Sequence, residues 1–276
     1  MKEKIVEQIG EYVLQSNLNR LEGTDIRFYG EPLVGFADAD DAVFTDLKTA
    51  VGPQHMTPGE AFDSSFGRGS FSGGTVISVA LPIGEEVRAS NRKQKEWPSR
   101  EWVLTRSFGD VFLKNFTAWL KKLLAEQGYR AIAPAEEEWF KIERVPGGIA
   151  SSWSHRHVAY VAGLGTFSLN EGFITEKGMA VRFTSIVTDC RLEPDKRTAQ
   201  DHLENCLYFK NGTCGACIRR CPVGAITKDG HDKMTCRERC YGEESKRFAE
   251  TMGGNPEKGA GCGLCQTGVP CEFMRP

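Results

Sequence analysis

The sequence predicts a mixed α+β fold, in which an N-terminal part of helices and strands precedes a cysteine-rich C-terminal part. Three observations support this prediction. Apolar residues recur at helical spacing near the N-terminus and in the middle of the chain, a continuous β-branched run lies between these regions, and eight of the ten cysteines follow Thr213. Helices that alternate with strands indicate a sheet covered by helices rather than a helical bundle.

The first predicted elements are a helix and a buried strand. The helix covers 2–16, where an apolar residue recurs every four positions on one face. These residues are Ile5, Ile9 and Val13. The run GTVISVAL at 74–81 has the composition of a central strand that is covered on both faces.

A long amphipathic helix is predicted next, and it ends at Gly128, in the position that a helix C-cap prefers. Its apolar face consists of Phe108, Phe112, Phe116, Leu120 and Leu123. Strands are predicted at 129–133 and 181–188, and the glycine-rich segments 64–74 and 145–154 are predicted to be loops. We expect a domain boundary near Thr188.

Composition restricts the class of protein. Apolar residues make up 40% of the chain and charged residues 26%, which is ordinary for a soluble globular protein. No run approaches the roughly 18–20 apolar residues that span a bilayer, and the first residues lack the apolar region of a signal peptide. We therefore expect a cytoplasmic protein, in which ten cysteines suggest metal ligation rather than disulfides. The net charge of −2 gives no indication of nucleic-acid binding.

The spacing of the cysteines predicts iron–sulfur clusters. Cys214, Cys217 and Cys221 form the pattern C-x2-C-x3-C-P, which is typical of bacterial cluster sites. The usual first cysteine of this run is absent, because Asn211 occupies its position. Cys206 is the nearest substitute.

Eight cysteines can be sorted into two sets, because the cysteine before the proline binds the other cluster in two-cluster ferredoxins. The first predicted set is Cys206, Cys214, Cys217 and Cys271, and the second is Cys221, Cys236, Cys262 and Cys265. Cys190 and Cys240 remain, and Cys240 is close enough to Cys236 to be a rival ligand. A zinc ribbon on the two C-x2-C pairs is the alternative, although it leaves Cys221 and three further cysteines unexplained.

Basic residues accompany the cysteines in the sequence. They are Arg219, Arg220, Lys228, Arg237 and Arg239. They could offset the negative charge of a thiolate-bound cluster. A solvated basic face is the alternative, and the sequence favours neither.

The segment ahead of the cysteines resembles one from epoxyqueuosine reductases. Residues 155–170 (HRHVAYVAGLGTFSLN) are similar to that family's pattern R-x-x-A-x-x-A-G-L-G-x-x-G-K/H-N. Further similar segments follow in the same order, at 172–178, 185–195, 214–226, 232–236 and 261–265. Reductive dehalogenases share this general plan.

The resemblance implies a fold and two kinds of cofactor. It implies a nitroreductase-like α/β domain at 1–189 that binds cobalamin or another corrinoid, and a ferredoxin-like domain at 190–276 with two [4Fe-4S] clusters. The corrinoid-binding residues that it implies are His155, Arg156, Gly163, Leu164, Gly165, Thr166 and Asn170. Glycine would let the backbone approach a flat macrocycle, whereas a helix end is the alternative for Gly163 and Gly165. A capping or surface position is the alternative for His155 and His157.

The chain departs from the family pattern at the proton donor. Epoxyqueuosine reductases carry an acidic residue in a V-D-[ST]-x-P strand, and the corresponding position here falls near Pro134 or Ile149. The nearest acids are Glu136, Glu137, Glu138 and Glu143, and a charge run of this kind is usually a solvated face. The sequence ends five residues after Cys271, so we also expect the family's usual C-terminal extension to be missing. A transfer RNA substrate is therefore doubtful from the sequence.

Three functions remain open. The first is an oxidoreductase similar to epoxyqueuosine reductase, and the second is an electron-transfer protein that binds or reactivates a corrinoid without substrate chemistry of its own. The third is a flavin enzyme, for which only the glycine stretch 67–74 could bind phosphate. The expected partners are a low-potential electron donor such as ferredoxin or flavodoxin, and a small molecule or a corrinoid protein, without a membrane.

Overall fold

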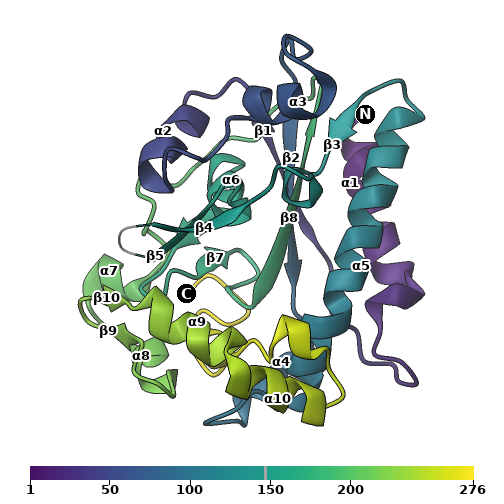
Figure 1. Cartoon of the computed structure of the whole chain (residues 1–276). Helices are drawn as coiled ribbons and strands as arrows, with labels where there is room; N and C mark the ends of the chain where they lie inside the picture. The colour runs from purple at the N-terminus through teal and green to yellow at the C-terminus, as the bar shows by residue number, and fades with distance from the viewer. Residues whose placement is uncertain (146–147) are drawn as a thin grey trace.

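A four-stranded antiparallel sheet lies at the centre of the computed structural model, which describes residues 1–145 and 148–276 (Figure 1). The strand order is β1 (Leu33–Asp38), β2 (Thr75–Pro82), β8 (Val181–Thr188) and β3 (Ala131–Ile132). The register pairs Phe36 of β1 with Ile77 of β2, and Ile77 with Ile186 of β8. β2 is buried along almost its whole length, which is the environment that its β-branched sequence predicts.

Helices cover both faces of this sheet (Figure 1). One face packs against α1 (Lys2–Gln15) and α5 (Arg100–Ala125), and the other against α2 (Val43–Ala50), α3 (Pro58–Phe66) and α6 (His155–Val161). Successive side chains of a strand point to opposite faces. Ile77 therefore enters the core beneath α5, whereas Val76 enters the core beneath α6. The fold is of mixed α/β class, as predicted.

The long elements follow the sequence prediction, and Phe108 is the exception. α1 and β8 coincide with the predicted segments to within one residue, but the strand predicted at 129–133 shortens to β3. Phe108 is 44% exposed, although it belongs to the predicted apolar face of α5. In this turn of α5 the buried residues are Ser107 and Gly109 instead. The Ser107 hydroxyl accepts a hydrogen bond from the Asn255 N–H, and Gly109 lies against Tyr29.

Both predicted loops contain regular structure. The segment 64–74 begins inside α3, which ends at Phe66. The segment 145–154 overlaps a hairpin of β4 (Ile142–Val145) and β5 (Gly148–Ser151), so the prediction of a loop is wrong there. Residues 146 and 147 of this predicted loop lie outside the described residues. The hairpin was missed because its strands are short and carry no clear alternation.

The remaining elements are short. Near the sheet they are α4 (Glu85–Arg92), the paired strands β6 (Gly165–Phe167) and β7 (Phe173–Thr175), and 3-10 turns at Asn17–Asn19 and Pro134–Glu136. The cysteine-rich part contains α7 (Leu207–Asn211), α8 (Ala216–Arg220), β9 (Ile226–Thr227), β10 (Gly230–His231), α9 (Lys233–Tyr241), α10 (Glu243–Thr251), and 3-10 turns at Pro256–Lys258 and Leu264–Gln266.

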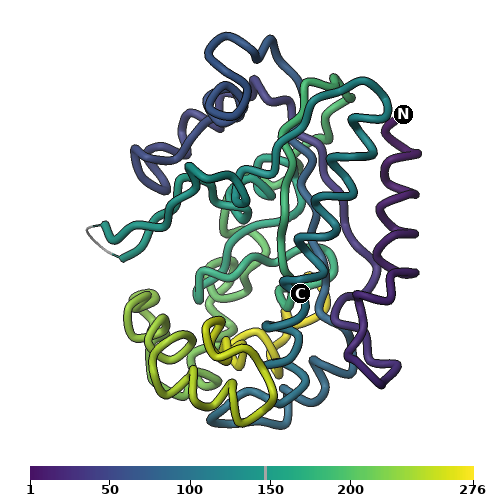
Figure 2. The backbone as a smooth tube through the Cα atoms, turned by 45° about the vertical axis from the view of Figure 1, so that its right-hand side comes forward, coloured from purple at the N-terminus to yellow at the C-terminus, as the bar shows by residue number. Residues whose placement is uncertain are grey.

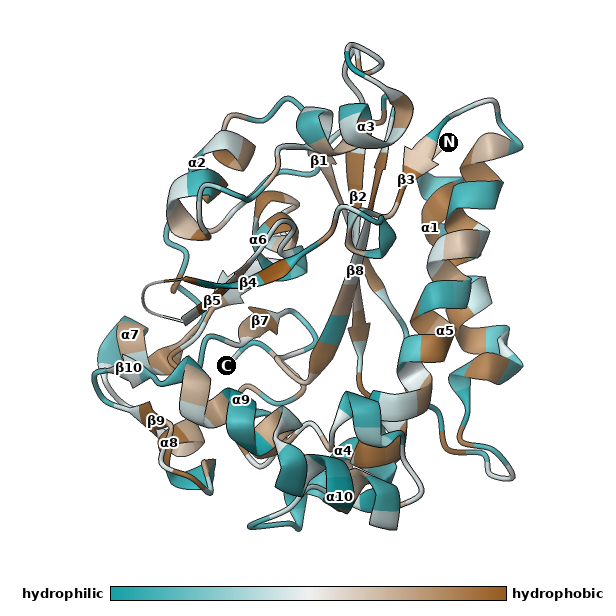
Figure 3. Cartoon of the chain, viewed as in Figure 1, coloured by the Kyte–Doolittle hydropathy of each residue, from teal (hydrophilic) through white to brown (hydrophobic). Residues whose placement is uncertain are grey.

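The cysteine-rich part packs against one end of the sheet and its helices. Figure 2 shows this part, green to yellow, next to the lower end of α5. Ala249 of α10 and Ala260 form a small core with Val103 of α5, and the Met179 N–H donates a hydrogen bond to the Cys271 carbonyl. Apolar residues concentrate in the central strands, whereas α10 is largely hydrophilic (Figure 3). Among the described helices, none has the length and apolar character that crossing a bilayer requires.

Candidate functional site

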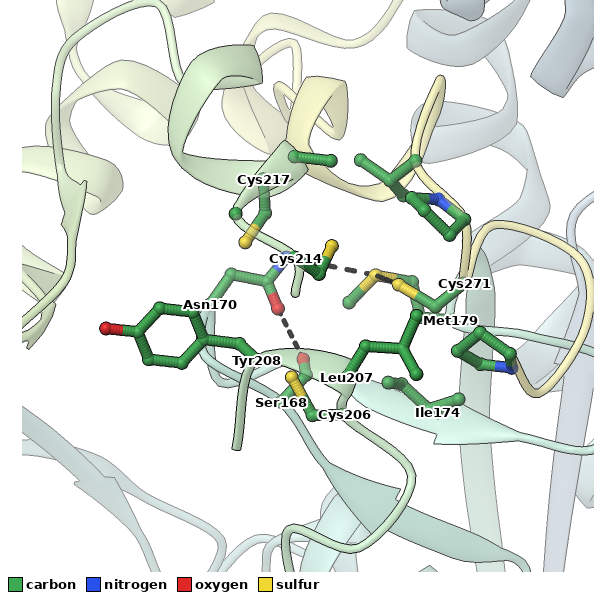
Figure 4. A pocket seen from close by; sticks show the side chains of 15 residues that line it. Ser168, Asn170, Ile174, Met179, Cys206, Leu207, Tyr208, Cys214, Cys217 and Cys271 are labelled. Atoms are coloured by element: carbon green, nitrogen blue, oxygen red, sulfur yellow. Dashed lines mark hydrogen bonds between the residues drawn. The ribbon is translucent and has the colours of Figure 1, made fainter. Parts of the chain in front are cut away.

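Four cysteines from distant points of the cysteine-rich part meet in one pocket (Figure 4). They are Cys206, Cys214, Cys217 and Cys271, the four residues of the first predicted set. Cys206 precedes α7, Cys217 lies in α8, and Cys271 comes from the last residues of the chain. The pocket wall is otherwise largely apolar, and the Cys271 sulfur lies 3.3 Å from the Met179 sulfur.

Burial makes two of these thiols, Cys217 and Cys271, difficult to ionise in the absence of a cation. Burial first, and then the neighbouring thiols of the set, raise the pKa of Cys217 to about 11 and that of Cys271 to about 12. Thiolates are the form that binds metal, and metal binding displaces their protons. Iron would therefore relieve both the desolvation and the mutual repulsion of this set.

A second group of cysteines lies beside the first. It contains the second predicted set and Cys240: Cys221, Cys236, Cys240, Cys262 and Cys265. The Cys221 sulfur accepts a hydrogen bond from the Ala225 N–H at 3.2 Å. Burial raises the pKa of Cys265, and Cys217 of the first set adds to this effect, so the two groups are neighbours.

Three buried N–H donors surround the second group and fit a sulfur-rich ligand. Trp102 Nε1, Arg106 Nε and Arg239 Nε have no hydrogen-bond partner among the described residues. Trp102 packs against Gly263, Arg106 packs against Gly261, and Arg239 immediately precedes Cys240. Buried donors are normally satisfied, and hydrogen bonds to the sulfurs of a cluster would satisfy these.

Arg220 fixes the loop that carries Cys262 and Cys265. Its Nε donates to the carbonyls of Leu264 and Thr267 at 3.1 and 2.9 Å. Lys228, Arg237 and Arg239 line the large cavity described below, whereas Arg219 does not belong to its lining. Of the five basic residues singled out near the cysteines, one thus supports the loop and three lie in the cavity wall.

The spread of the cysteines bears on the choice between zinc and clusters. In 1–145 and 148–276 no three His, Cys, Asp or Glu side chains converge closely enough for a single metal ion. A cubane bonds each thiolate to a different iron, so its ligands stand farther apart than those of one zinc ion. The zinc alternative has no compact ligand group among the described residues.

A large cavity of about 1190 Å³ opens beside the second cysteine group. This volume exceeds the roughly 300–1,000 Å³ of ordinary small-molecule sites. One part of its wall is apolar and aromatic, formed by Phe140, Ile142, Ile149, Trp153, Tyr160 and Phe167. Basic residues outnumber acidic ones: Arg106, Arg156, Arg182, Lys228, Lys233, Arg237 and Arg239 against Asp46, Glu171 and Asp229. The cavity therefore suits a large ligand that is partly apolar and carries negative charge or polar groups.

Three of the seven residues implied as corrinoid ligands line this cavity, namely His155, Arg156 and Asn170. His155 begins α6, and its Nδ1 lies 2.8 Å from the Ser185 hydroxyl, which also accepts a hydrogen bond from Trp153 Nε1. Burial lowers the pKa of His155 to about 4, so its imidazole is neutral at pH 7. Asn170 donates from Nδ2 to the Cys265 carbonyl at 3.2 Å and thereby connects this segment to the second cysteine group.

The other four residues lie away from the cavity lining. Gly163, with φ of +74°, follows the end of α6, and its N–H donates to the Tyr160 carbonyl. This is the helix-end alternative. Leu164 packs against Gly35 of β1, Gly165 pairs with β7, and Thr166 accepts a hydrogen bond from the Asn205 N–H. These positions therefore serve the packing of the fold, which differs from the expected contact with a macrocycle.

His157 also lines the cavity, two positions after His155. Its Nδ1 lies 2.7 Å from the Ser154 hydroxyl, and its ring contacts Phe167. Burial lowers the pKa of His157 to about 3, with a further contribution from Arg156. The imidazole is therefore a second neutral histidine in the cavity wall at pH 7.

Four acids lie near the position where the family carries its proton donor: Glu136, Glu137, Glu138 and Glu143. In the part of the chain that the structure describes, none of them lines the cavity. Glu136 accepts a hydrogen bond from the Thr117 hydroxyl, Glu137 accepts one from the Ser65 hydroxyl at 3.0 Å, and Glu138 and Glu143 are exposed. The family's acid corresponds in this chain to Ile149 or to Pro134. Ile149 lies in the cavity wall, and Pro134 lies in a buried turn. An apolar side chain thus stands at this part of the cavity.

Glu171 is an acid in the cavity wall that no sequence pattern singles out. Its carboxylate lies 3.2 Å from His231 Nδ1 and 3.1 Å from Lys233 Nζ, and its carbonyl accepts a hydrogen bond from Arg156. Burial alone would raise the pKa of Glu171, but the bonds from His231 and Lys233 outweigh burial and hold it below the usual range. Glu171 is therefore ionised near neutral pH. Its φ of +54° is the only positive value of a non-glycine residue among the described residues.

Cys190 lies apart from both cysteine groups. It follows the end of β8 opposite to the cavity, and its sulfur contacts the Met1 sulfur at 3.5 Å. Its separation from the other cysteines agrees with its exclusion from both predicted sets.

Solved structures show which fold this is. No protein-family model matches the chain, and no curated protein matches it. The epoxyqueuosine reductase of Bacillus subtilis, solved with a catalytic loop swung out of the active site, is similar over 100% of this chain and 68% of its own, with 19% identity and a TM-score of 0.50. The enzyme of Streptococcus thermophilus covers 99% of this chain and 66% of its own at 16% identity and a TM-score of 0.53.

A third structure is an epoxyqueuosine reductase with an epoxyqueuosine-modified transfer RNA stem loop. The similarity covers 98% of this chain and 65% of that one, at 20% identity and a TM-score of 0.52. Each alignment thus includes almost all of this chain. The chain has the fold of the epoxyqueuosine reductases.

Proposed function

We propose that the chain is an iron–sulfur oxidoreductase similar to epoxyqueuosine reductase, in which two [4Fe-4S] clusters deliver electrons to a corrinoid in the large cavity. The proposal includes a corrinoid-binding domain at 1–189, a ferredoxin-like domain at 190–276 and a cytoplasmic location. One observation supports it above the others. The second cysteine group shares the walls of a single cavity with His155, Arg156 and Asn170.

In this proposal the cysteines serve electron delivery, and other residues of the cavity wall bind the ligand. The first set, Cys206, Cys214, Cys217 and Cys271, would bind one cluster, and the second group would bind the other at the cavity. A bound corrinoid would supply the cobalt at which the substrate is reduced. His155 offers a neutral imidazole, and Arg156, Lys233 and Arg239 offer positive charge to polar or anionic groups of the ligand.

The second candidate is a corrinoid-binding electron-transfer or reactivating protein. The cavity wall supports it, because Glu171 is held ionised and Ile149 stands where one assignment places the family's acid. An enzyme that reduces a substrate also needs a proton source, whereas a protein that only reduces a corrinoid does not. Epoxyqueuosine in transfer RNA remains a substrate to test, since one structure with this fold was solved with such a stem loop.

Metal content tests the cluster part of the proposal. Protein purified without oxygen should contain about eight irons per chain, with matching acid-labile sulfide, because each of two clusters holds four. Iron and sulfide analysis with electron paramagnetic resonance of the reduced protein measures this. Stoichiometric zinc without sulfide would contradict it.

Cobalamin binding tests the cavity. Titration should change the cobalamin absorbance spectrum, and His155→Ala should weaken the affinity about tenfold or more, because it removes a side chain from the wall. Leu164→Ala is the matched control, since Leu164 was implied by the same resemblance but packs against β1. Equal losses in both variants, or no binding by the unmodified chain, would contradict the site.

Turnover separates the two candidate functions. The corrinoid-loaded protein is incubated with a low-potential reductant and transfer RNA that carries epoxyqueuosine. Formation of queuosine would establish the enzyme, whereas reduction of the corrinoid without any queuosine would favour the electron-transfer protein.

A further inference from the structure

Helix α9 presents two cysteines to the second cluster site. Cys236 and Cys240 are four residues apart, so they lie on the same face of the helix. Their thiols interact electrostatically with each other, and both residues line the large cavity. The other cysteines of this group, Cys221, Cys262 and Cys265, come from outside α9.

Both thiols lie within reach of the loop that carries Cys262. Cys236 has Cys262 and Cys265 as electrostatic neighbours, and the Cys240 thiol lies close to the backbone of Cys262. The backbone fixes this arrangement, because the Cys240 carbonyl accepts hydrogen bonds from the Gly261 N–H at 3.2 Å and from the Ser245 hydroxyl at 2.7 Å.

Two cationic side chains also lie beside Cys240. Arg106 and Arg182 stand near its thiol, and Arg106 Nε is buried without a partner among the described residues. A thiolate bound to iron needs such compensation in a buried site. Cys240 thus has the contacts of a ligand, although the family pattern matches only Cys236.

The second group contains one cysteine more than a [4Fe-4S] cluster needs. A [4Fe-4S] cluster takes one thiolate for each of four irons. Cys221, Cys262 and Cys265 supply three, and α9 offers two for the remaining iron. One of the two thiols, Cys236 or Cys240, is therefore in excess.

We propose that Cys236 and Cys240 share the fourth ligand position of the second cluster, so that either thiolate can bind its iron. This inference rests on the proposed function. In an exchange, one iron–sulfur bond breaks and another forms, and the incoming thiol passes its proton to the departing thiolate. No electron moves, and the net charge of the site is unchanged.

Iron analysis of four proteins tests this inference: the unmodified chain, Cys236→Ala, Cys240→Ala and the double variant. Each is reconstituted without oxygen and assayed for iron, sulfide and the paramagnetic resonance of its reduced clusters. We expect about eight irons in the unmodified chain and in each single variant, and about four in the double variant. The single variants should give different resonance signals, because the ligand differs.

The first cluster is the internal control for folding. The four irons that remain in the double variant show that the chain is folded, and added 2-mercaptoethanol should restore the missing four by supplying a thiolate. Loss of four irons in either single variant, or eight irons in the double variant, would overturn the shared position. An unmodified chain without iron and sulfide would instead refute the proposed function.

Discussion

At the scale of single residues, the cysteines differ in whether their surroundings suit a metal ligand. Cys206 shares a pocket with three other thiols, whereas Cys190 contacts the Met1 sulfur at the far end of β8. Cys206→Ala should therefore lower the iron content by about four per chain, because one cluster loses a ligand. Cys190→Ala should leave the iron content unchanged. Iron and sulfide assays check both variants, and iron loss in Cys190→Ala would contradict the sorting of ligands.

Buried neutral histidines predict a loss of stability in mild acid. His55 is fully buried against Trp153, and its Nε2 accepts a hydrogen bond from the Ser154 N–H. Burial, and to a smaller extent Lys48, lowers the pKa of His55 to about 4. The unfolded chain takes up a proton near pH 6.5, so the contribution of neutral His55 is complete above that pH and is lost as the pH falls toward 4.

His55→Gln tests this pH dependence, because the amide can still accept from Ser154 but does not titrate. Between about pH 6 and 4.5, the free energy of unfolding should fall less steeply in the variant, by about 1 kcal/mol per pH unit. Urea unfolding at several pH values measures the slope. Equal slopes would show that His55 does not remain neutral in the folded protein. His155 and His157 should keep part of the slope in both proteins.

The residues of the site differ in how far sequence could predict them. The spacing of Cys214, Cys217 and Cys221 was informative, because a cluster constrains neighbouring ligands in the chain. Trp102 and Arg106 were not accessible to such reasoning, since they lie in α5, more than 130 residues before the loop that they touch. A donor that pairs with a sulfur atom leaves no spacing pattern, and only the packing of α5 against the cysteine-rich part reveals it.

At the scale of elements, long periodic segments were predictable and short ones were not. α1 and β8 carry enough apolar residues to define their period, and they form where expected. The hairpin β4–β5 and the strands β6 and β7 have three or four residues each. Such strands are stabilised by their partners rather than by their own sequence, and they contribute much of the cavity wall.

The 3-10 turn that carries Cys265 depends on one close contact. Gly263 has φ of +62°, and a Cβ there would lie 2.0 Å from the Trp102 ring. Gly263→Ala should therefore lower the free energy of unfolding by about 2–5 kcal/mol, through overpacking and left-handed strain. It should also reduce the iron content, because Cys262 directly precedes Gly263 and Cys265 lies in the turn. Denaturant unfolding and iron analysis measure these effects.

Gly212→Ala is the control for this turn. Gly212 has a similar φ of +71°, but a Cβ there would meet no atom within 4 Å. Its substitution should cost only about 1–2 kcal/mol, the strain of a left-handed alanine. Equal effects at the two positions would show that contact with Trp102 does not matter.

At the scale of the whole molecule, the last residues of the chain connect the sheet, α4 and the first cysteine set. The Met179 and Ala180 N–H groups donate to the carbonyls of Cys271 and Glu272. The segments on the two sides of the predicted boundary near Thr188 are therefore in direct contact, because the last residues of the chain hydrogen-bond to residues that precede this boundary. This contact was not predictable, because it joins residues more than 90 positions apart through backbone groups.

Glu272 forms ion pairs that hold the C-terminal segment against α4. Its side chain is only 2% exposed and bridges Arg92 Nη2 at 2.6 Å and Arg88 Nη1 at 3.4 Å, while its Oε2 accepts the Gly268 N–H at 2.7 Å. Removal of Glu272 would leave Arg88 and Arg92, which are partly exposed and still pair with Glu85, with fewer partners, at a cost of about 1–3 kcal/mol. Glu272→Ala should lower the free energy of unfolding by that amount and release Cys271, with loss of about four irons. Glu250→Ala, on the exposed side of α10, should change stability by less than about 0.5 kcal/mol. If Glu272→Ala kept all its iron, the first cluster would not depend on the position of the C-terminal segment.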